Sequence, residues 1–154
     1  MVVQIQLAIY PQFRKAIELA LEAGEFDDDS IYRRFPTGCC GDTSDLLAQY
    51  LLANGIKTAY VCGTYGSSPD GNVQTHAWLV VDKHIIVDIT GDQFSSNPAF
   101  LNYDRSVYVG EEDDFHKLFA MEYREIHEHP GVSGLESFCK HRLWNLYRKT
   151  LKYI

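Results

Sequence analysis

The fold of this chain is decided by the stretch Thr75-His76-Ala77-Trp78-Leu79-Val80-Val81, the turn Asp82-Lys83-His84, and the stretch Ile85-Ile86-Val87-Asp88-Ile89-Thr90. Apolar residues fill nearly every position on both sides of the turn, which indicates two β-strands joined as a hairpin. Strands this apolar are buried on both faces, so the stretch predicts the middle of a sheet.

Two ionisable residues interrupt the hairpin: His76 at the start of its first strand and Asp88 near the end of its second. Burying either one costs free energy unless the two satisfy each other, so their joint presence is the first sign of chemistry. A three-residue loop would oppose Val81 to Ile85 and Asp88 to Trp78, which places Asp88 diagonally beside His76 on one face. A two-residue loop would put them on opposite faces. The pair therefore predicts an odd-length loop or a bulge.

The composition suits a single compact domain. The chain has 154 residues, of which 45% are hydrophobic and 13% aromatic. Its net charge of -7 and pI near 5.3 argue against a nucleic-acid partner, which would need clustered Lys and Arg. Basic residues gather only near the C-terminus, where we interpret them as the solvated face of a helix: Arg142, Arg148, Lys149 and Lys152.

The sequence shows no secretory or membrane signal. It does not open with a charged n-region and apolar h-region, and no apolar run approaches the ~20 residues of a membrane span. We therefore expect no membrane partner and a cytoplasmic location, with leaderless secretion left open. The four cysteines lack zinc-site spacing, and a chain of this size needs no disulfide, so we expect free thiols at Cys39, Cys40, Cys62 and Cys139.

Periodicity and turn residues predict the other elements. Before the hairpin they indicate a helical turn or strand over 2–9 and a helix from Pro11 to a cap at Gly24. A polar surface loop over 25–36 and an amphipathic helix over 42–53, closed by Asn54-Gly55, are expected next. A strand over 56–65 and a loop over 66–72 then lead to the hairpin. After the hairpin they indicate a loop over 91–98, a strand over 105–109 and a helix from an acid-rich turn at 111–114 to Tyr123. A break at His129-Pro130-Gly131 precedes a final helix over 133–153. The residues of this helix that we expect to face inward are Leu135, Phe138, Leu143, Leu146, Tyr147 and Leu151.

Cys40 stands at the head of the amphipathic helix. A thiol becomes a nucleophile when its thiolate is stabilised, and a helix N-terminus and a neighbouring imidazolium do this together. Cys40, His76 and Asp88 thus supply a nucleophile, a general base and a carboxylate that fixes the imidazole ring. Asp42 and Asp45 in the first turn oppose a thiolate, so we expect the imidazole to contribute most of the activation.

The order of these residues resembles the core of transglutaminase-like cysteine enzymes within the papain-like superfamily. In that family a cysteine opens a helix ending at Gly-Ile, a His-Ala-Trp strand follows, and the carboxylate lies in an Asp-x-Thr strand. The resemblance covers Thr37 to Phe94, and the matching segments are Cys40-Gly41-Asp42, Leu46-Leu47, Gly55-Ile56, His76-Ala77-Trp78 and Val87-Asp88-Ile89-Thr90. It implies Cys40, not Cys39, as the nucleophile, a cysteine helix packed on an antiparallel sheet, and chemistry on acyl groups.

The oxyanion donor departs from the papain pattern. Papain places a Gln several residues before its cysteine, whereas this chain has Arg33 and Arg34 in that region. Backbone N–H groups at Cys40 and its neighbours can serve instead. Gln93 and Thr90 are candidates for ordering the site, although a polar loop residue and a capped strand end explain them equally well.

Several other residues have competing explanations. Cys39 is a further candidate for substrate or oxyanion contact, but a cysteine taken alone is more often a buried thiol. Trp78 is a candidate substrate platform, but a core position is the commoner explanation. His84 competes as the base only if its loop folds inward. His127 and His129 have no further metal ligands near them in sequence, so we expect both in solvent.

Together these observations predict one α+β domain over 1–154 with a papain-like or transglutaminase-like fold, in which the nucleophile helix packs on a central antiparallel sheet flanked by N- and C-terminal helices. We expect a cysteine protease, amidase or acyltransferase that acts on protein or peptide amides and uses no metal or organic cofactor. The alternative is a catalytically inactive module that binds or regulates a partner, and a toxin- or immunity-type protein of bacterial competition has less support. The substrate, the choice between hydrolysis and transfer, and the oligomeric state stay open.

Overall fold

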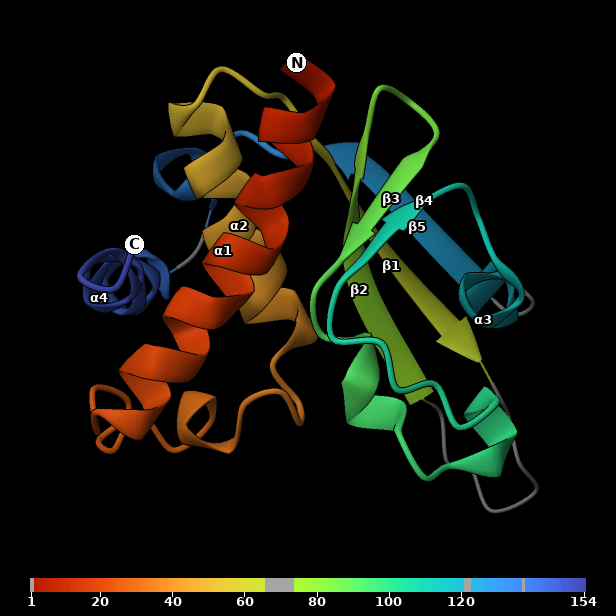
Figure 1. Ribbon diagram of the computed structural model, residues 1–154, viewed down its shortest axis with the longest axis horizontal. Coiled ribbons are helices and arrows are strands. Elements are labelled where there is room, and N and C mark those ends of the chain that lie inside the picture. Colours follow the sequence, from red (N-terminus) through yellow and green to blue (C-terminus); the bar gives the residue numbers. More distant parts are fainter. Residues whose placement is uncertain (1, 66–73, 121–122, 137) are drawn as a thin grey trace.

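The computed structural model describes residues 2–65, 74–120, 123–136 and 138–154 (Figure 1). The chain is α+β, as predicted. Its helices and strands follow in the order α1 (Val2–Glu22), α2 (Cys40–Ala53), β1 (Ala59–Tyr65), β2 (Gln74–Val81), β3 (Ile85–Asp88), β4 (Tyr108–Gly110), α3 (Asp114–Lys117), β5 (Tyr123–Glu128) and α4 (Lys140–Leu151). The predicted loop over 66–72 lies outside the described residues.

The strands form one antiparallel sheet in the order β4-β3-β2-β1-β5, with β2 in the centre as its apolar sequence predicted. The β2–β3 turn has three residues, because Val81 pairs with Ile85 and Leu79 with Val87. Continuing this register opposes Asp88 to Trp78. The predicted odd-length loop is confirmed, and it places Asp88 on the same face of the sheet as His76.

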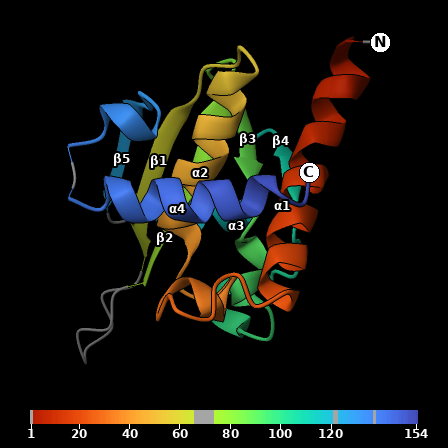
Figure 2. The same ribbon diagram turned by 90° about the vertical axis from the view of Figure 1, so that its left-hand side faces the viewer.

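The sheet carries apolar clusters on both faces. In Figure 1, α1, α2 and α4 lie on one side of the sheet, and α3 with the segment 91–100 lies on the other. Figure 2 shows α4 crossing the outer side of α2, which itself lies against the sheet. The helix-side cluster includes Phe13, Ile17, Leu46, Leu47, Leu51 and Leu79. The opposite cluster contains Val61, Trp78, Ile86, Phe94, Phe100, Phe115 and Phe119. Burial on both sides of β2 explains its continuous apolar run.

Helix α1 is longer than predicted. It already includes residues 2–9 and passes through Pro11 instead of starting there. Pro11 is exposed, so its ring faces solvent and its missing N–H removes one bond from the helical ladder. Phe13 and Ile17, both fully buried, anchor the helix on the far side of this defect.

The predicted helix from the acidic turn to Tyr123 is wrong. Helix α3 covers only Asp114–Lys117, a 3₁₀ turn continues to Ala120, and β5 follows as an edge strand paired with β1. Edge strands expose one side to solvent, so polar residues interrupt the apolar signal that would mark them in sequence. The final helix is also shorter than predicted. It begins at Lys140, and Phe138, expected inward, is 99% exposed.

The charged segments that we expected to be solvated pair with each other. Arg142 of α4 binds Asp29 at 2.8 Å and Asp42 at 2.9 Å, and Lys149 lies 3.4 Å from Asp28. The segment 25–36 is also less exposed than a polar loop would be, since three of its aromatic side chains are buried: Phe26, Tyr32 and Phe35. Through Asp29, which shares the Arg142 guanidinium with Asp42, this segment therefore links α4 to the start of α2.

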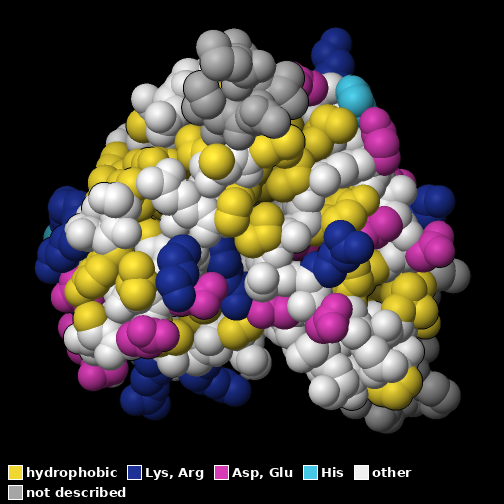
Figure 3. Space-filling model, in the orientation of Figure 1, with side chains coloured by type: hydrophobic (Ala, Val, Ile, Leu, Met, Phe, Trp, Pro, Cys, Tyr) yellow, Lys and Arg dark blue, Asp and Glu magenta, His cyan; other side chains and the backbone are white. Residues whose placement is uncertain are grey.

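Over the described part of the chain, none of the helices is both long enough and apolar enough to span a bilayer. On the face shown in Figure 3, Lys and Arg side chains lie among Asp and Glu side chains and form no patch of a single sign.

Candidate active site

The two adjacent cysteines have different environments. Cys39 is fully buried, and its thiol points to the carbonyl oxygens of Thr37 at 3.3 Å and Ile31 at 3.5 Å. Burial, with the negative charge of Asp42, raises the pKa of Cys39 to about 12. This thiol stays protonated at neutral pH and is inaccessible to solvent. Cys40 is only partly buried and begins α2.

The Cys40 thiol lies where its anion is stabilised. Burial disfavours the thiolate, but a hydrogen bond to His76, the charge of that imidazolium and the backbone N–H of Ala77 outweigh burial and lower the pKa of Cys40. The position at the N-terminus of a 14-residue helix adds the favourable end of the helix dipole. Cys40 is therefore the activated thiol of the adjacent pair.

His76 and Asp88 form a buried pair. Nε2 of His76 lies 2.7 Å from Oδ2 of Asp88, and both side chains are almost inaccessible to solvent. Burial alone would lower the pKa of His76, but the charge and hydrogen bond of Asp88 raise it to about 9. The pKa of Asp88 is held well below its usual range, since the two histidines beside it outweigh burial. With Nε2–H donating to Asp88, Nδ1 is the nitrogen left for the Cys40 thiol.

Gln93 and Thr90 both order this pair, as their place after Asp88 suggested. The Gln93 amide nitrogen lies 3.3 Å from Nδ1 of His76 and donates to the carbonyl of Thr90, while its oxygen accepts from the N–H of Gly38. Thr90 donates its backbone N–H to Oδ1 of Asp88 at 3.0 Å. Gln93 thus ties the base to the segment immediately before the nucleophile.

Trp78 is a core residue. Its side chain is 1% exposed, and its ring lies 5.5 Å from that of His76 inside the aromatic cluster. The cross-strand pairing explains this, because Trp78 lies opposite Val61 in the sheet centre. It encloses the imidazole in apolar surroundings, which keeps water from the buried pair.

Three further histidines, His84, His127 and His129, have partners outside the His76–Asp88 pair. His84 stays in its loop with an exposed side chain that bonds Glu111 at 2.8 Å. His127 is exposed as expected, but the expectation for His129 is wrong. His129 is buried, and its Nε2 lies 2.8 Å from Oδ1 of Asp45. This tertiary contact between the residue that follows β5 and α2 gives the buried ring a hydrogen-bond partner. The two residues are too far apart in sequence for the contact to be predicted.

The two acidic residues near the start of α2 are both partnered. Asp42, in the first turn, pairs with Arg142, and Asp45 pairs with His129. The repulsion that Asp42 would exert on a thiolate at Cys40 is therefore reduced by the guanidinium of Arg142 from α4.

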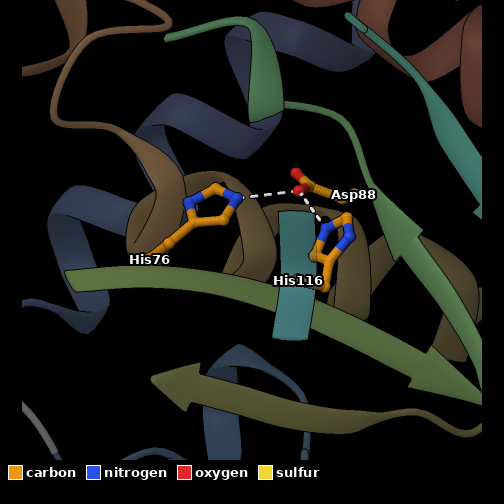
Figure 4. A group of neighbouring side chains, drawn as sticks. All are labelled: His76, Asp88 and His116. Atoms are coloured by element: carbon orange, nitrogen blue, oxygen red, sulfur yellow. Dashed lines mark hydrogen bonds and ion pairs between the residues drawn. The ribbon is translucent and has the colours of Figure 1, made fainter. Parts of the chain in front are cut away.

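A second histidine, His116, completes the cluster, and our sequence analysis missed it. Figure 4 shows the Asp88 carboxylate between the rings of His76 and His116. Nε2 of His116 lies 2.7 Å from the same Oδ2, and its Nδ1 lies 2.6 Å from Oδ1 of Asp113. The available signal was Asp113-x-x-His116, the spacing of a helix N-cap and its third residue. Nothing in the sequence connects position 116 to position 88.

The three side chains His76, Asp88 and His116 offer ligand atoms within 4.8 Å of one another, a grouping that can hold a metal ion. Both nitrogen-to-oxygen separations are 2.7 Å, the length of a charge-assisted hydrogen bond. Ligands at ~2.1 Å around one metal ion would stand further apart. One carboxylate oxygen lies at hydrogen-bond distance from both rings.

A separate cavity of about 1010 Å³ opens on the sheet, lined among others by Trp78, Ile86, Arg124 and Ile126. Neither Cys40 nor His76 lines it. The chemistry of the thiol and the imidazole is therefore a better guide to function than this cavity.

No protein-family model matches this chain, and we found no similar curated protein or solved structure.

Proposed function

We propose that this protein is a thiol-dependent enzyme of the transglutaminase-like or papain-like type, which hydrolyses or transfers acyl groups of protein or peptide amides. Cys40 is the nucleophile, His76 the general base and acid, and Asp88 the residue that orients His76. The observation that carries the proposal is the buried His76–Asp88 pair of β2 and β3, together with the thiol at the start of α2 whose pKa His76 lowers. This combination of groups is the arrangement that activates a nucleophile.

In the first half of the reaction the Cys40 thiolate attacks the substrate carbonyl carbon. A carbon–sulfur bond forms and the carbonyl oxygen becomes an oxyanion. The first-turn N–H groups of a helix have no partners within that helix, so those of α2 beside Cys40 are available to stabilise the oxyanion. His76 then gives its Nδ1 proton to the leaving amine, the carbon–nitrogen bond breaks, and a thioester remains on Cys40.

In the second half, neutral His76 takes a proton from an attacking water or amine. The new bond to the carbonyl carbon forms as the carbon–sulfur bond breaks, and Cys40 leaves as a thiolate beside the imidazolium. Asp88 keeps Nε2 protonated throughout, so Nδ1 is always the nitrogen that exchanges the proton. Water yields hydrolysis and an amine yields acyl transfer.

Thiol labelling tests the activated nucleophile. The intact protein is treated with iodoacetamide at several pH values, and labelled peptides are mapped by mass. We expect Cys40 to react faster below pH 7 than the other three cysteines, because its pKa is lowered whereas those of Cys39 and Cys62 are raised. Equal slow labelling of all four would contradict the proposal and favour a binding module.

Activity is tested on a generic protein substrate such as casein, with and without a fluorescent primary amine. Release of new amino termini would indicate hydrolysis, and incorporation of the amine would indicate transfer. Cys40→Ala should abolish both, whereas Cys39→Ala is the matched control and should retain them. Equal turnover by the Cys40→Ala protein would overturn the assignment.

A further inference from the structure

We propose that His116 and Asp113 are positioning residues: His116 stands behind Asp88 as a buried imidazolium and sets the pH range over which Cys40 and His76 carry opposite charges. This inference rests on the proposed function of the site. It adds two residues to the series, which then runs from Asp113 through His116, Asp88 and His76 to Cys40.

The hydrogen-bond partners of His116 require both of its nitrogens to carry protons. Nε2 faces Asp88 at 2.7 Å, and Nδ1 faces Asp113 at 2.6 Å. A neutral imidazole has only one N–H, so its other nitrogen would direct a lone pair at a carboxylate oxygen. The ring is fully buried, and no rearrangement toward water relieves that contact. Two short bonds to carboxylates therefore select the cation.

The surroundings hold His116 in one orientation. Its ring stacks on Tyr108 at 5.4 Å and meets the edge of Trp78 at 4.8 Å. The Arg124 guanidinium donates a hydrogen bond to the backbone carbonyl of His116, and the backbone N–H of His116 donates to Oδ1 of Asp113. The ionisable groups that contact His116 come from β2, β3, β4, β5 and the segments between them, and they are His76, Asp88, Tyr103, Tyr108, Asp113 and Arg124, with Arg105 lying over the ring of Tyr108.

The cation acts on His76 through the shared carboxylate. The two imidazole rings are 6.2 Å apart, with Oδ2 of Asp88 bonded to both. A positive charge at this position opposes the proton on His76 and favours the thiolate on Cys40. Replacing His116 with a neutral residue should therefore raise the pKa of both groups. At 6.2 Å and an effective dielectric constant of ~20, the expected shift is about one to two pH units.

The test compares wild type, His116→Gln and Asp113→Asn by the rate of Cys40 alkylation between pH 4 and 10. Asn is as good an N-cap as Asp, so Asp113→Asn keeps the start of α3 and removes only the charge that holds the His116 proton. We expect the midpoints of the pH profile to move upward by about one to two pH units in His116→Gln, and by a smaller amount in the same direction in Asp113→Asn.

The direction in which the midpoints of the pH profile move separates this role from a merely structural one. If His116 only braced Asp88, its loss would loosen the carboxylate and move the His76 midpoint downward, which would overturn the proposal. Unchanged midpoints in His116→Gln would overturn it equally. An unactivated Cys40 in wild type would instead refute the proposed function, so the two failures are distinguishable.

A spectroscopic measurement on the wild-type protein keeps the inference testable even where a variant does not fold. Histidine ring ¹⁵N NMR at pH 7 distinguishes an imidazolium, with two protonated nitrogens, from either neutral tautomer. We expect His116, assigned by its absence from the spectrum of the variant or by its coupling to ring protons, to show two protonated nitrogens. A neutral His116 ring would refute the proposal.

Discussion

Asp88→Asn is the substitution that probes the site most directly. Oδ2 of Asp88 accepts from both His76 and His116, and Oδ1 accepts from the N–H of Thr90. An Asn side chain has one acceptor oxygen and one NH₂ donor. Whichever way it turns, the donor faces an N–H that needs an acceptor. The substitution therefore removes the charge and leaves at least one buried donor unsatisfied.

The cost is large because the carboxylate is buried. The pKa of His76 is about 9 against its ordinary value of 6.5, and this difference alone corresponds to about 3 kcal/mol. Removing one partner of a buried ion pair costs about 3–5 kcal/mol in general. We expect the free energy of unfolding in urea to fall by about 3–5 kcal/mol.

The same substitution should lower the reactivity of the Cys40 thiol. Without the charge and hydrogen bond of Asp88, the pKa of His76 falls and its imidazolium form is less stable. The pKa of Cys40 then returns toward its ordinary value of 9.0. A thiol with that pKa is only about 1% thiolate at pH 7, so we expect alkylation of Cys40 at that pH to be slower than in the wild-type protein. Iodoacetamide labelling with mass mapping, under conditions where circular dichroism shows a folded protein, measures this.

Asp29→Asn is the matched control, since it removes a partly buried carboxylate that pairs with Arg142 and does not touch His76. It should lower stability and leave the pH profile of Cys40 unchanged. Wild-type reactivity of Cys40 in the folded Asp88→Asn protein would refute the reasoning, because it would mean that the thiol is activated without the supported imidazole.

Three further predictions follow from the packing and the charges. Gly63→Ala should lower the free energy of unfolding by about 3 kcal/mol in urea, because a Cβ there would stand 2.1 Å from the backbone oxygen of Phe119; a change below 1 kcal/mol would show that the strand shifts freely. In Cys40→Ser, which removes the thiolate, stability should be fully present below pH 6.5 and decline as the pH rises above that value, since Asp88 still raises the pKa of folded His76 and the unfolded chain releases its proton first; a flat profile in a series of urea titrations would contradict this. Dialysis against EDTA should leave the melting temperature unchanged, because the atoms around Asp88 share protons, whereas a loss restored by Zn²⁺ would show that they bind a metal.

The central hairpin shows how far local information reaches. The requirement that two buried ionisable groups satisfy each other, combined with the alternation of side chains along a strand, was enough to predict the three-residue turn and the pairing of Val81 with Ile85. Cys40 at the head of α2 was equally accessible, because a helix that ends at Asn54-Gly55 can be followed back to its start by periodicity.

The errors occur where an element owes its form to distant neighbours. β5 is an edge strand whose hydrogen bonds all go to β1, some sixty residues earlier, so its own pattern carries little signal. α1 continues through Pro11 because tertiary packing of its buried face outweighs one lost bond. His129 was expected in solvent, but it is buried against Asp45 of α2.

By itself the sequence determined the α+β class, the register of the central hairpin, and the adjacency of His76 and Asp88, since each follows from periodicity and from the free-energy cost of burying polar groups. Only the tertiary structure decided that Asp88 serves two imidazoles and that a second carboxylate, Asp113, lies at the far end of the series. The physical reason is that the contact between Asp88 and His116 joins residues 28 positions apart, through the packing of α3 against the sheet. No local pattern encodes such a meeting.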